Sequence, residues 1–170
     1  LNVIRDILGD KYNYAFIGRP CDVSGLKSFI KSNSIYNKKI KLLVSFFCGG
    51  TPSTHGTSEL AQTHCDSQDI EFIRYRGNGW PGKTVIKAGN KKEYIDYEHA
   101  WGSVLNKYLN NRCKVCSDSI GVNADIVFAD AWNIKNSKID LTESEGKSLM
   151  IVRNEAGLKA YSLFKEDLHI

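Results

Sequence analysis

The sequence predicts an α/β fold with a central parallel or mixed sheet, crossover helices and a β-hairpin insertion around residues 70–97. Two observations carry this prediction. Short apolar runs alternate with amphipathic segments along most of the chain, which is the pattern of strand–helix–strand units. Between residues 70 and 97 the pattern changes to alternating polar and apolar residues separated by glycine-rich turns, as in antiparallel hairpins. We expect residues 1–170 to form a single domain.

Apolar periodicity and turn residues define the individual elements. In the first half we expect a helix over residues 1–10, strands over 14–18 and 39–47, a helix between them that Asp22 or Ser24 caps, and a helix over 58–65. Between residues 70 and 97 we expect a strand over 70–76, a turn over 77–83 and a hairpin across Gly89 and Asn90. After these we expect an amphipathic helix over 98–110, strands over 124–132 and 148–154, and a helix over 155–168.

Composition narrows the class of protein. The 170 residues are 42% hydrophobic and 25% charged, as in ordinary globular proteins. A net charge of +4 with scattered lysines argues against a nucleic-acid partner. No apolar run is long enough to span a bilayer, so we expect a cytoplasmic location. The chain begins at Leu1 inside a helix-like segment, and we therefore expect it to be a fragment of a longer protein.

Four of the five cysteines occupy positions suited to metal ligands. Cys113 and Cys116 form a C-x-x-C pair, while Cys21 and Cys48 each follow an apolar, strand-like run. Loops at the carboxyl ends of parallel strands meet at one edge of a sheet, so Cys21 and Cys48 are expected there together. Four converging thiolates suit either a tetrahedral zinc ion or an iron–sulfur cluster, and both alternatives stay open on spacing alone. Cys65 lies in a polar stretch and is expected to be a free surface thiol.

Two further segments carry candidate ligand-binding groups. The Gly/Ser/Thr-rich loop FCGGTPSTHGTSEL lies between a strand and a helix, where Ser53 and Thr57 could donate to phosphate. A flexible connector explains this loop equally well. The segment RYRGNGWPGK combines cations with an indole, which suits a phosphorylated aromatic cofactor such as a flavin, although a surface hairpin tip is the plain alternative.

Four ordered segments between residues 14 and 135 resemble motifs of the coenzyme F420 hydrogenase/dehydrogenase beta-subunit family. They are GRPCDVSGLKSF, FFCGGTPSTHGT, IEFIRYRGNGW and RCKVCSDSIGVNADIVFADAW. Asp22 stands where the family usually has glutamine, and Ala129 replaces a glycine before Asp130.

The resemblance implies an electron-transfer oxidoreductase that uses FAD and a 4Fe-4S cluster. It assigns Cys21, Cys48, Cys113 and Cys116 as the cluster ligands. The expected flavin contacts are Ser53, Thr57, Arg74, Arg76, Trp80, Lys83, Asp130 and Trp132. The reaction partner would be a redox protein or a deazaflavin- or nicotinamide-type small molecule. The alternatives are a zinc-stabilised binding module without catalysis and a degenerate family member without flavin.

Overall fold

The computed structural model of the chain describes residues 4, 6, 10–65 and 70–169. The chain divides into two compact units that are interleaved along the sequence, and each is described by itself. Unit 1 consists of Leu1–Cys48, Ser117–Ala129 and Ser148–Ile170, and unit 2 consists of Gly49–Cys116 and Asp130–Lys147. The single domain expected over residues 1–170 stays a prediction.

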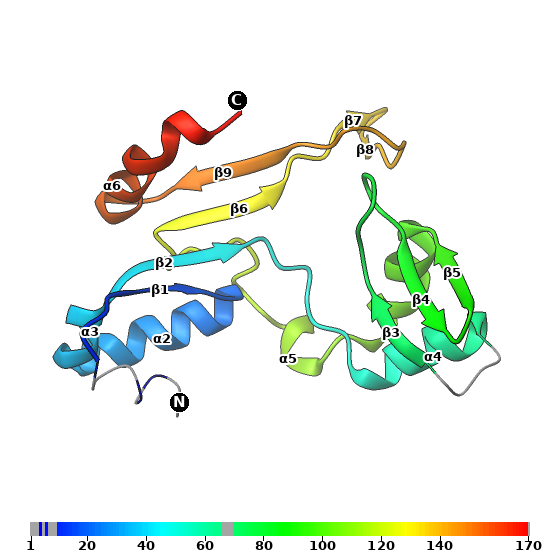
Figure 1. The fold of residues 1–170 in the computed structure, drawn as a ribbon, viewed down its shortest axis with the longest axis horizontal. Coiled ribbons are helices and arrows are strands. Elements are labelled where there is room, and N and C mark those ends of the chain that lie inside the picture. Colours follow the sequence, from blue (N-terminus) through cyan, green and yellow to red (C-terminus); the bar gives the residue numbers. More distant parts are fainter. Residues whose placement is uncertain (1–3, 5, 7–9, 66–69, 170) are drawn as a thin grey trace. The chain divides into compact units, whose positions relative to one another are not determined.

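Unit 1 is built on a four-stranded mixed sheet in the order β1-β2-β6-β9. Strands β1, β2 and β6 run parallel, and β9 runs opposite to β6 (Figure 1). The elements are β1 (Tyr14–Ile17), α2 (Pro20–Ser32), α3 (Ser34–Lys39), β2 (Ile40–Phe46), β6 (Ile126–Asp130), β9 (Ser148–Val152), α6 (Glu155–Phe164) and the short 3₁₀ helix η4 (Lys165–Asp167). The sheet with its crossover helix confirms the predicted α/β class.

The strand register aligns the carboxyl ends of β1 and β2. Ile17 lies opposite Val44, and the N–H of Gly18 donates to the Val44 carbonyl at 3.1 Å. Because parallel strands end at the same edge, the chain segments that follow them start from neighbouring points. These segments contain Cys21 and Cys48, as the sequence predicts.

Helices cover both faces of this sheet. A buried apolar cluster joins α2 to β2 and β6 through Val23, Leu26, Ile30, Leu43 and Val127, among others. Neighbouring strand residues point to opposite faces, so Ile126 faces away from this cluster. Gly157 of α6 packs on that second face, since a Cβ added to it would lie 3.1 Å from the Ile126 side chain. Unit 1 therefore has three layers.

The buried carboxylate of Asp125 connects three segments of unit 1. Its Oδ2 accepts the N–H of Leu43 at 2.7 Å, and its Oδ1 accepts the side-chain amide of Asn154 at 2.7 Å. Asn154 in turn caps α6 by accepting the N–H of Gly157 at 3.0 Å. One side chain thus links β2, the start of β6 and the N-terminus of α6.

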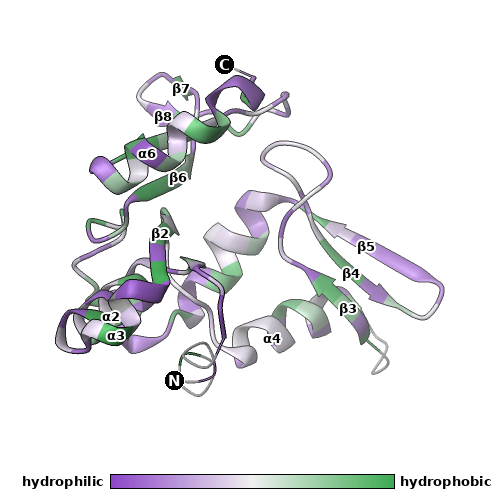
Figure 2. Ribbon diagram, turned by 60° about the vertical axis from the view of Figure 1, so that its left-hand side comes forward, coloured by the Kyte–Doolittle hydropathy of each residue, from purple (hydrophilic) through white to green (hydrophobic). Residues whose placement is uncertain are grey.

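Unit 2 contains the antiparallel sheet β3-β4-β5, which confirms the predicted hairpin insertion. Its elements are α4 (Thr54–His64), β3 (Ile70–Arg74), β4 (Thr84–Ala88), β5 (Lys91–Ile95), the π-helix η2 (Glu98–Val104), the 3₁₀ helix η3 (Leu105–Tyr108), α5 (Asn111–Lys114), β7 (Ile134–Lys135) and β8 (Lys138–Ile139). The β4–β5 turn at Gly89, with φ +56°, confirms the hairpin expected there. Strand β5 is largely hydrophilic, as expected for the edge of a sheet (Figure 2).

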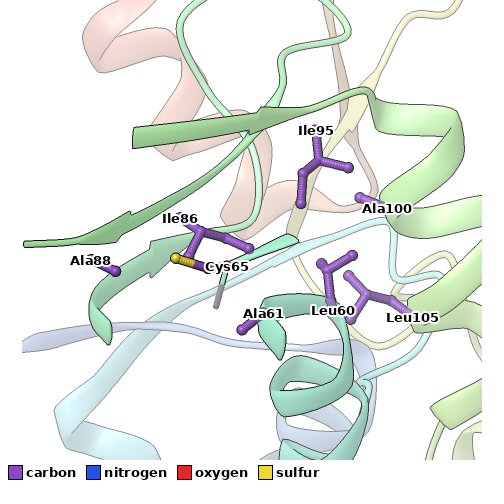
Figure 3. Close-up of a cluster of buried hydrophobic side chains, with 8 residues drawn as sticks. All are labelled: Leu60, Ala61, Cys65, Ile86, Ala88, Ile95, Ala100 and Leu105. Carbon is purple, nitrogen blue, oxygen red and sulfur yellow. The ribbon is translucent and has the colours of Figure 1, made fainter. Parts of the chain in front are cut away.

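Cys65 lies in the apolar core of unit 2, so the expectation of a surface thiol was wrong. It is 9% exposed and packs in a cluster that includes Leu60, Ile86, Ile95 and Leu105 (Figure 3). The polar neighbours of Cys65 in the sequence were misleading because Cys65 directly follows α4, whose apolar side faces the sheet. A free cysteine behaves as a small apolar residue in such a place.

Three other sequence expectations need adjustment. Helix α2 begins at Pro20, with Arg19 as its N-cap, so neither Asp22 nor Ser24 caps it. The helix expected over 98–110 is a π-helix followed by a 3₁₀ helix. The helix expected over 1–10 falls mostly outside the described residues. Within the described parts of the chain, no helix is both long and apolar enough to cross a bilayer.

We expect Asp125→Ala to lower the free energy of unfolding by about 2–4 kcal/mol, because it leaves the buried N–H of Leu43 without its acceptor. Urea unfolding measures this loss. The exposed Asp167 provides the control, and Asp167→Ala should change stability by less than about 0.5 kcal/mol. Equal losses in the two variants would contradict the role given to Asp125.

We expect Cys65→Ser to destabilise the protein by about 1–3 kcal/mol, because it places a hydroxyl in an apolar cluster. Cys65→Ala should cost less, since it adds no polar group. The matched control is Cys21→Ser at an exposed position, measured in metal-free protein, where stability should stay within about 0.5 kcal/mol of wild type. A Cys65→Ser variant as stable as this control would remove Cys65 from the core.

Candidate functional site

The first pair of candidate ligands lies in unit 1. Cys21 is exposed and is the second residue of α2, so it lies at the positive end of a 13-residue helix. Cys48 is half-buried, and its N–H donates to the Ser119 carbonyl at 2.9 Å. A helix N-terminus favours the thiolate form that binds metals. The sequence places Cys21 at the junction between a loop and a helix, and in the structure Cys21 lies in the first helical turn.

Arg19 adds a positive charge close to both of these thiols. Its guanidinium donates to Asp22 at 2.8 Å, and this interaction is the main cause of the raised pKa of Arg19. Cys21 and Cys48, in their thiolate forms, make smaller contributions in the same direction. Asp22, which departs from the family motif, thus forms an ion pair with Arg19, two residues before Cys21.

The second pair of candidate ligands lies in unit 2. The Sγ of Cys113 accepts the N–H of Thr51 at 3.4 Å, and Cys113 is half-buried in α5. Cys116 is exposed, and its N–H donates to the Cys113 carbonyl at 3.3 Å. Gly50, with φ +109°, approaches so closely that a Cβ there would lie 3.3 Å from the Cys113 Cβ. The C-x-x-C pair is thus a turn with one sulfur already hydrogen-bonded.

All five cysteines are free thiols. Two of the predicted ligands belong to unit 1 and two belong to unit 2. Among the residues that the structure describes, no three His, Cys, Asp or Glu side chains gather as a metal site would require. The convergence of the four thiols on one centre stays a prediction.

Arg76 is the centre of the best-formed polar site in unit 2. Its guanidinium pairs with Asp130 at 2.5 Å and also donates to the carbonyl of Pro81. It lies 4.8 Å from the ring of Trp80, 5.0 Å from Trp132 and 5.4 Å from Tyr97. We call Arg76, Trp80, Tyr97, Asp130 and Trp132 the arginine–aromatic cluster.

The arginine–aromatic cluster joins two sequence segments that were predicted separately. The rings of Trp80 and Trp132 are 4.5 Å apart, and Tyr97 is 5.6 Å from Trp132. Four predicted flavin contacts therefore meet here. Arg76 and Trp80 come from the segment RYRGNGW, and Asp130 and Trp132 come from the segment FADAW. Tyr97 was missed because an isolated tyrosine after a strand carries no pattern. Burial raises the pKa of Tyr97, so its phenol stays neutral near pH 7.

The other predicted flavin contacts have separate surroundings. Among the described residues, the buried Nε of Arg74 has no hydrogen-bond partner, and strand β3 ends at Arg74. Lys83 pairs with Asp96 at 3.0 Å. Ser53 caps α4 by accepting the N–H of Gly56, and Thr57 hydrogen-bonds to the Tyr75 hydroxyl at 2.5 Å. Ser53 and Thr57 are thus both used within the fold.

A cavity of about 390 Å³ lies beside the arginine–aromatic cluster within unit 2. Residues 77–83, 94 and 96–98 line it together with Leu141 and Glu143. The glycine-rich turn makes this shape possible, because Gly77, Gly79 and Gly82 all have positive φ. Trp80 and Lys83 are the only predicted site residues among those that line the cavity in the described part of the chain.

The chain resembles known proteins in sequence and in fold. Residues 11–170 match the family described as the C terminus of the coenzyme F420 hydrogenase/dehydrogenase beta subunit. Comparison with curated proteins gives no match. The fold is similar to that of a chain in the F420-reducing NiFe hydrogenase complex from Methanosarcina barkeri, with 16% sequence identity and a TM-score of 0.59.

The structural similarity covers 91% of this chain and 49% of the Methanosarcina chain, so this chain spans about half the length of that relative. At 16% identity this likeness shows the fold alone. The sequence match carries the assignment because it covers nearly the whole chain, in agreement with the four motifs. The chain belongs to the coenzyme F420 hydrogenase/dehydrogenase beta-subunit family and corresponds to the C-terminal part of that subunit.

Proposed function

We propose that the chain is an electron-transfer oxidoreductase domain that carries a 4Fe-4S cluster and binds FAD. The observation that carries this proposal is the different placement of the five thiols. Cys65 is buried in an apolar core, whereas Cys21 and Cys116 are exposed, Cys48 and Cys113 are half-buried, and Arg19 adds a positive charge near Cys21. Conversion of a thiol to a bound thiolate is favoured in such electropositive, accessible surroundings.

The donor set fits a cluster in its chemistry. Four cysteine thiolates are the usual ligands of a 4Fe-4S cluster, and N–H···S hydrogen bonds tune the potential of such clusters. The Thr51 N–H donated to Cys113 is one bond of this kind. Arg19, near Cys21 and Cys48, would offset part of the negative charge of the thiolates. Zinc would accept the same four sulfurs, but it has no redox chemistry and would not explain a hydrogenase/dehydrogenase family.

For FAD the fit is partial. Trp80 and Trp132 offer aromatic surfaces for a flavin ring, and the buried Nε of Arg74 has no acceptor within the part of the chain that the structure describes. Arg76 and Lys83 are already paired with Asp130 and Asp96, so either would have to exchange its partner to hold phosphate. We propose the aromatic pair and Arg74 as the main contacts.

The remaining predicted residues take secondary parts in this proposal. Asp130 would orient Arg76 beside the ring, and Ser53 and Thr57 would offer hydroxyls near the start of α4. When bound, FAD supplies two-electron hydride chemistry and the cluster supplies one-electron transfer. The other reactant would be a redox partner protein or a deazaflavin- or nicotinamide-type small molecule in the cytoplasm.

A second candidate is a family member that keeps the cluster ligands but has lost flavin binding. The pairing of both Arg76 and Lys83 with carboxylates favours it, because neither cation is available for a pyrophosphate as the chain stands. The two candidates differ in one measurable property, the flavin content of protein purified under anaerobic conditions. A colourless protein with one zinc per chain would instead support the zinc-stabilised binding module.

We expect Cys116→Ser to reduce iron and acid-labile sulfide from about four of each per chain to near none, because one ligand is lost. Iron analysis and the visible absorption of anaerobically purified protein measure this. Cys65→Ala is the matched control, since it changes a thiol outside the proposed set, and it should keep its iron. Equal iron in both variants would show that the ligands are misassigned.

We expect Arg74→Gln to lower flavin occupancy at least about tenfold without changing iron content, since it removes a fixed positive charge from the proposed site. Arg76→Gln should lower both flavin occupancy and thermal stability, because Arg76 also connects three rings and Asp130. Flavin released by denaturation and the melting temperature separate the two effects. Wild-type flavin occupancy in Arg74→Gln would exclude Arg74 from the flavin site.

A further inference from the structure

The cavity beside the arginine–aromatic cluster differs in charge from what the sequence predicts. The segment RYRGNGWPGK suggests a basic site for phosphate, but only one of its cations, Lys83, lines the cavity. Three carboxylates line the same cavity, those of Asp96, Glu98 and Glu143. The acidic residues were not recognised from the sequence because Glu143 lies more than 40 residues after Asp96 and Glu98.

The pairing of these groups leaves the cavity negative. Asp96 is neutralised by Lys83 at 3.0 Å. Within the described part of the chain, neither Glu98 nor Glu143 has an ion-pair partner. Two carboxylates on one concave surface repel anions and raise the local concentration of cations.

Aromatic rings form the rest of the wall. Trp80, Tyr94 and Tyr97 all line the cavity. The face of an aromatic ring attracts a cation, and cages of such rings bind ammonium groups. Trp80 and Tyr97 already have the guanidinium of Arg76 within 4.8 Å and 5.4 Å of their ring centres. Arg76 therefore already occupies part of the surface of these two rings, and a bound cation would contact the ring surface that Arg76 leaves open together with Tyr94.

The Trp80 ring is held in place before any ligand binds. It lies against Trp132, and Gly146 approaches so closely that a Cβ there would lie 2.5 Å from the ring. A fixed ring loses little freedom when a ligand binds to it. The volume of about 390 Å³ is within the range of small-ligand sites.

We propose that this cavity binds an organic cation, specifically an alkylammonium or alkylguanidinium group. Glu98 and Glu143 would provide the charge, and Trp80, Tyr94 and Tyr97 the aromatic contacts. The same group could belong to a free amine or to a lysine or arginine side chain. None of the four proposed cluster ligands lines this cavity, and cation binding here needs neither iron nor flavin, although Trp80 is shared with the proposed flavin contacts.

The test is a titration of the ¹⁵N-labelled 170-residue chain at constant ionic strength, followed by backbone and indole NMR shifts. The cationic probes are agmatine and a capped Gly-Arg-Gly peptide, and the anionic probe is inorganic pyrophosphate. We expect a cationic probe to shift the signals of Trp80 and Tyr97, with no response to pyrophosphate. Binding of agmatine alone would indicate a free amine as the ligand, and tighter binding of the peptide would indicate a side chain.

The double variant Glu98→Gln/Glu143→Gln should bind the cationic probe at least about tenfold more weakly, since it removes both unpaired charges. The matched control is Glu93→Gln/Glu145→Gln, which makes the same change at exposed positions outside the cavity and should bind within about twofold of wild type. The proposal would be overturned by shifts with pyrophosphate at the cavity, by no shift with either cation, or by equal weakening in both double variants. Because the chain is tested without cofactors, the result does not depend on the proposed function.

Discussion

The buried carboxylate of Asp125 is the interaction on which the architecture of unit 1 depends. It accepts hydrogen bonds from the backbone of β2 and from the residue that caps α6. Strand β6 returns to the sheet after the chain has passed through unit 2, so its register cannot be set by a short turn. A charged acceptor in the dry interior is satisfied in only one register, because any other would leave it unpaired.

That register also determines where the first pair of thiols lies. Once β1, β2 and β6 are aligned, Cys21 and Cys48 follow strands that end at the same edge, near the guanidinium of Arg19. The backbone of Cys48 is fixed further by its bond to Ser119, three residues beyond Cys116 in the sequence. The fold of unit 1 thus places one half of the proposed ligand set through strand pairing and the Asp125 hydrogen bonds.

Unit 2 is organised by a different principle, in which one cation neutralises a carboxylate and contacts three rings. Arg76 connects the glycine-rich turn to Asp130 and Trp132, which lie more than 50 residues further along the chain. This use of Arg76 has a functional consequence. A cation that the sequence suggests for phosphate binding is occupied internally, while the adjacent cavity presents carboxylates and aromatic rings. Arg76 therefore serves the stability of unit 2, and the adjacent cavity suits a cation better than a phosphate.

The sequence by itself determined the α/β class, the order of most strands and helices, and the family. Apolar periodicity and glycine-rich turns depend only on residues that are close in sequence, so they can be recognised without the tertiary structure. The family motifs likewise predicted Asp130 and Trp132 as site residues without showing what they contact. The extent of the site was harder to predict, because the residues of its cavity come from three separate segments.

Only the tertiary structure decided the burial and the charge balance of individual side chains. Cys65 has polar neighbours in sequence but apolar neighbours in space, because the end of α4 packs on a sheet formed later in the chain. The sequence suggests that Arg76 and Lys83 are free cations, but in the structure they form ion pairs with Asp130 and Asp96. Glu98 and Glu143 are far apart in the sequence, and only the structure shows that both line one cavity. Pairing and desolvation depend on contacts between distant segments, and a linear pattern does not contain these contacts.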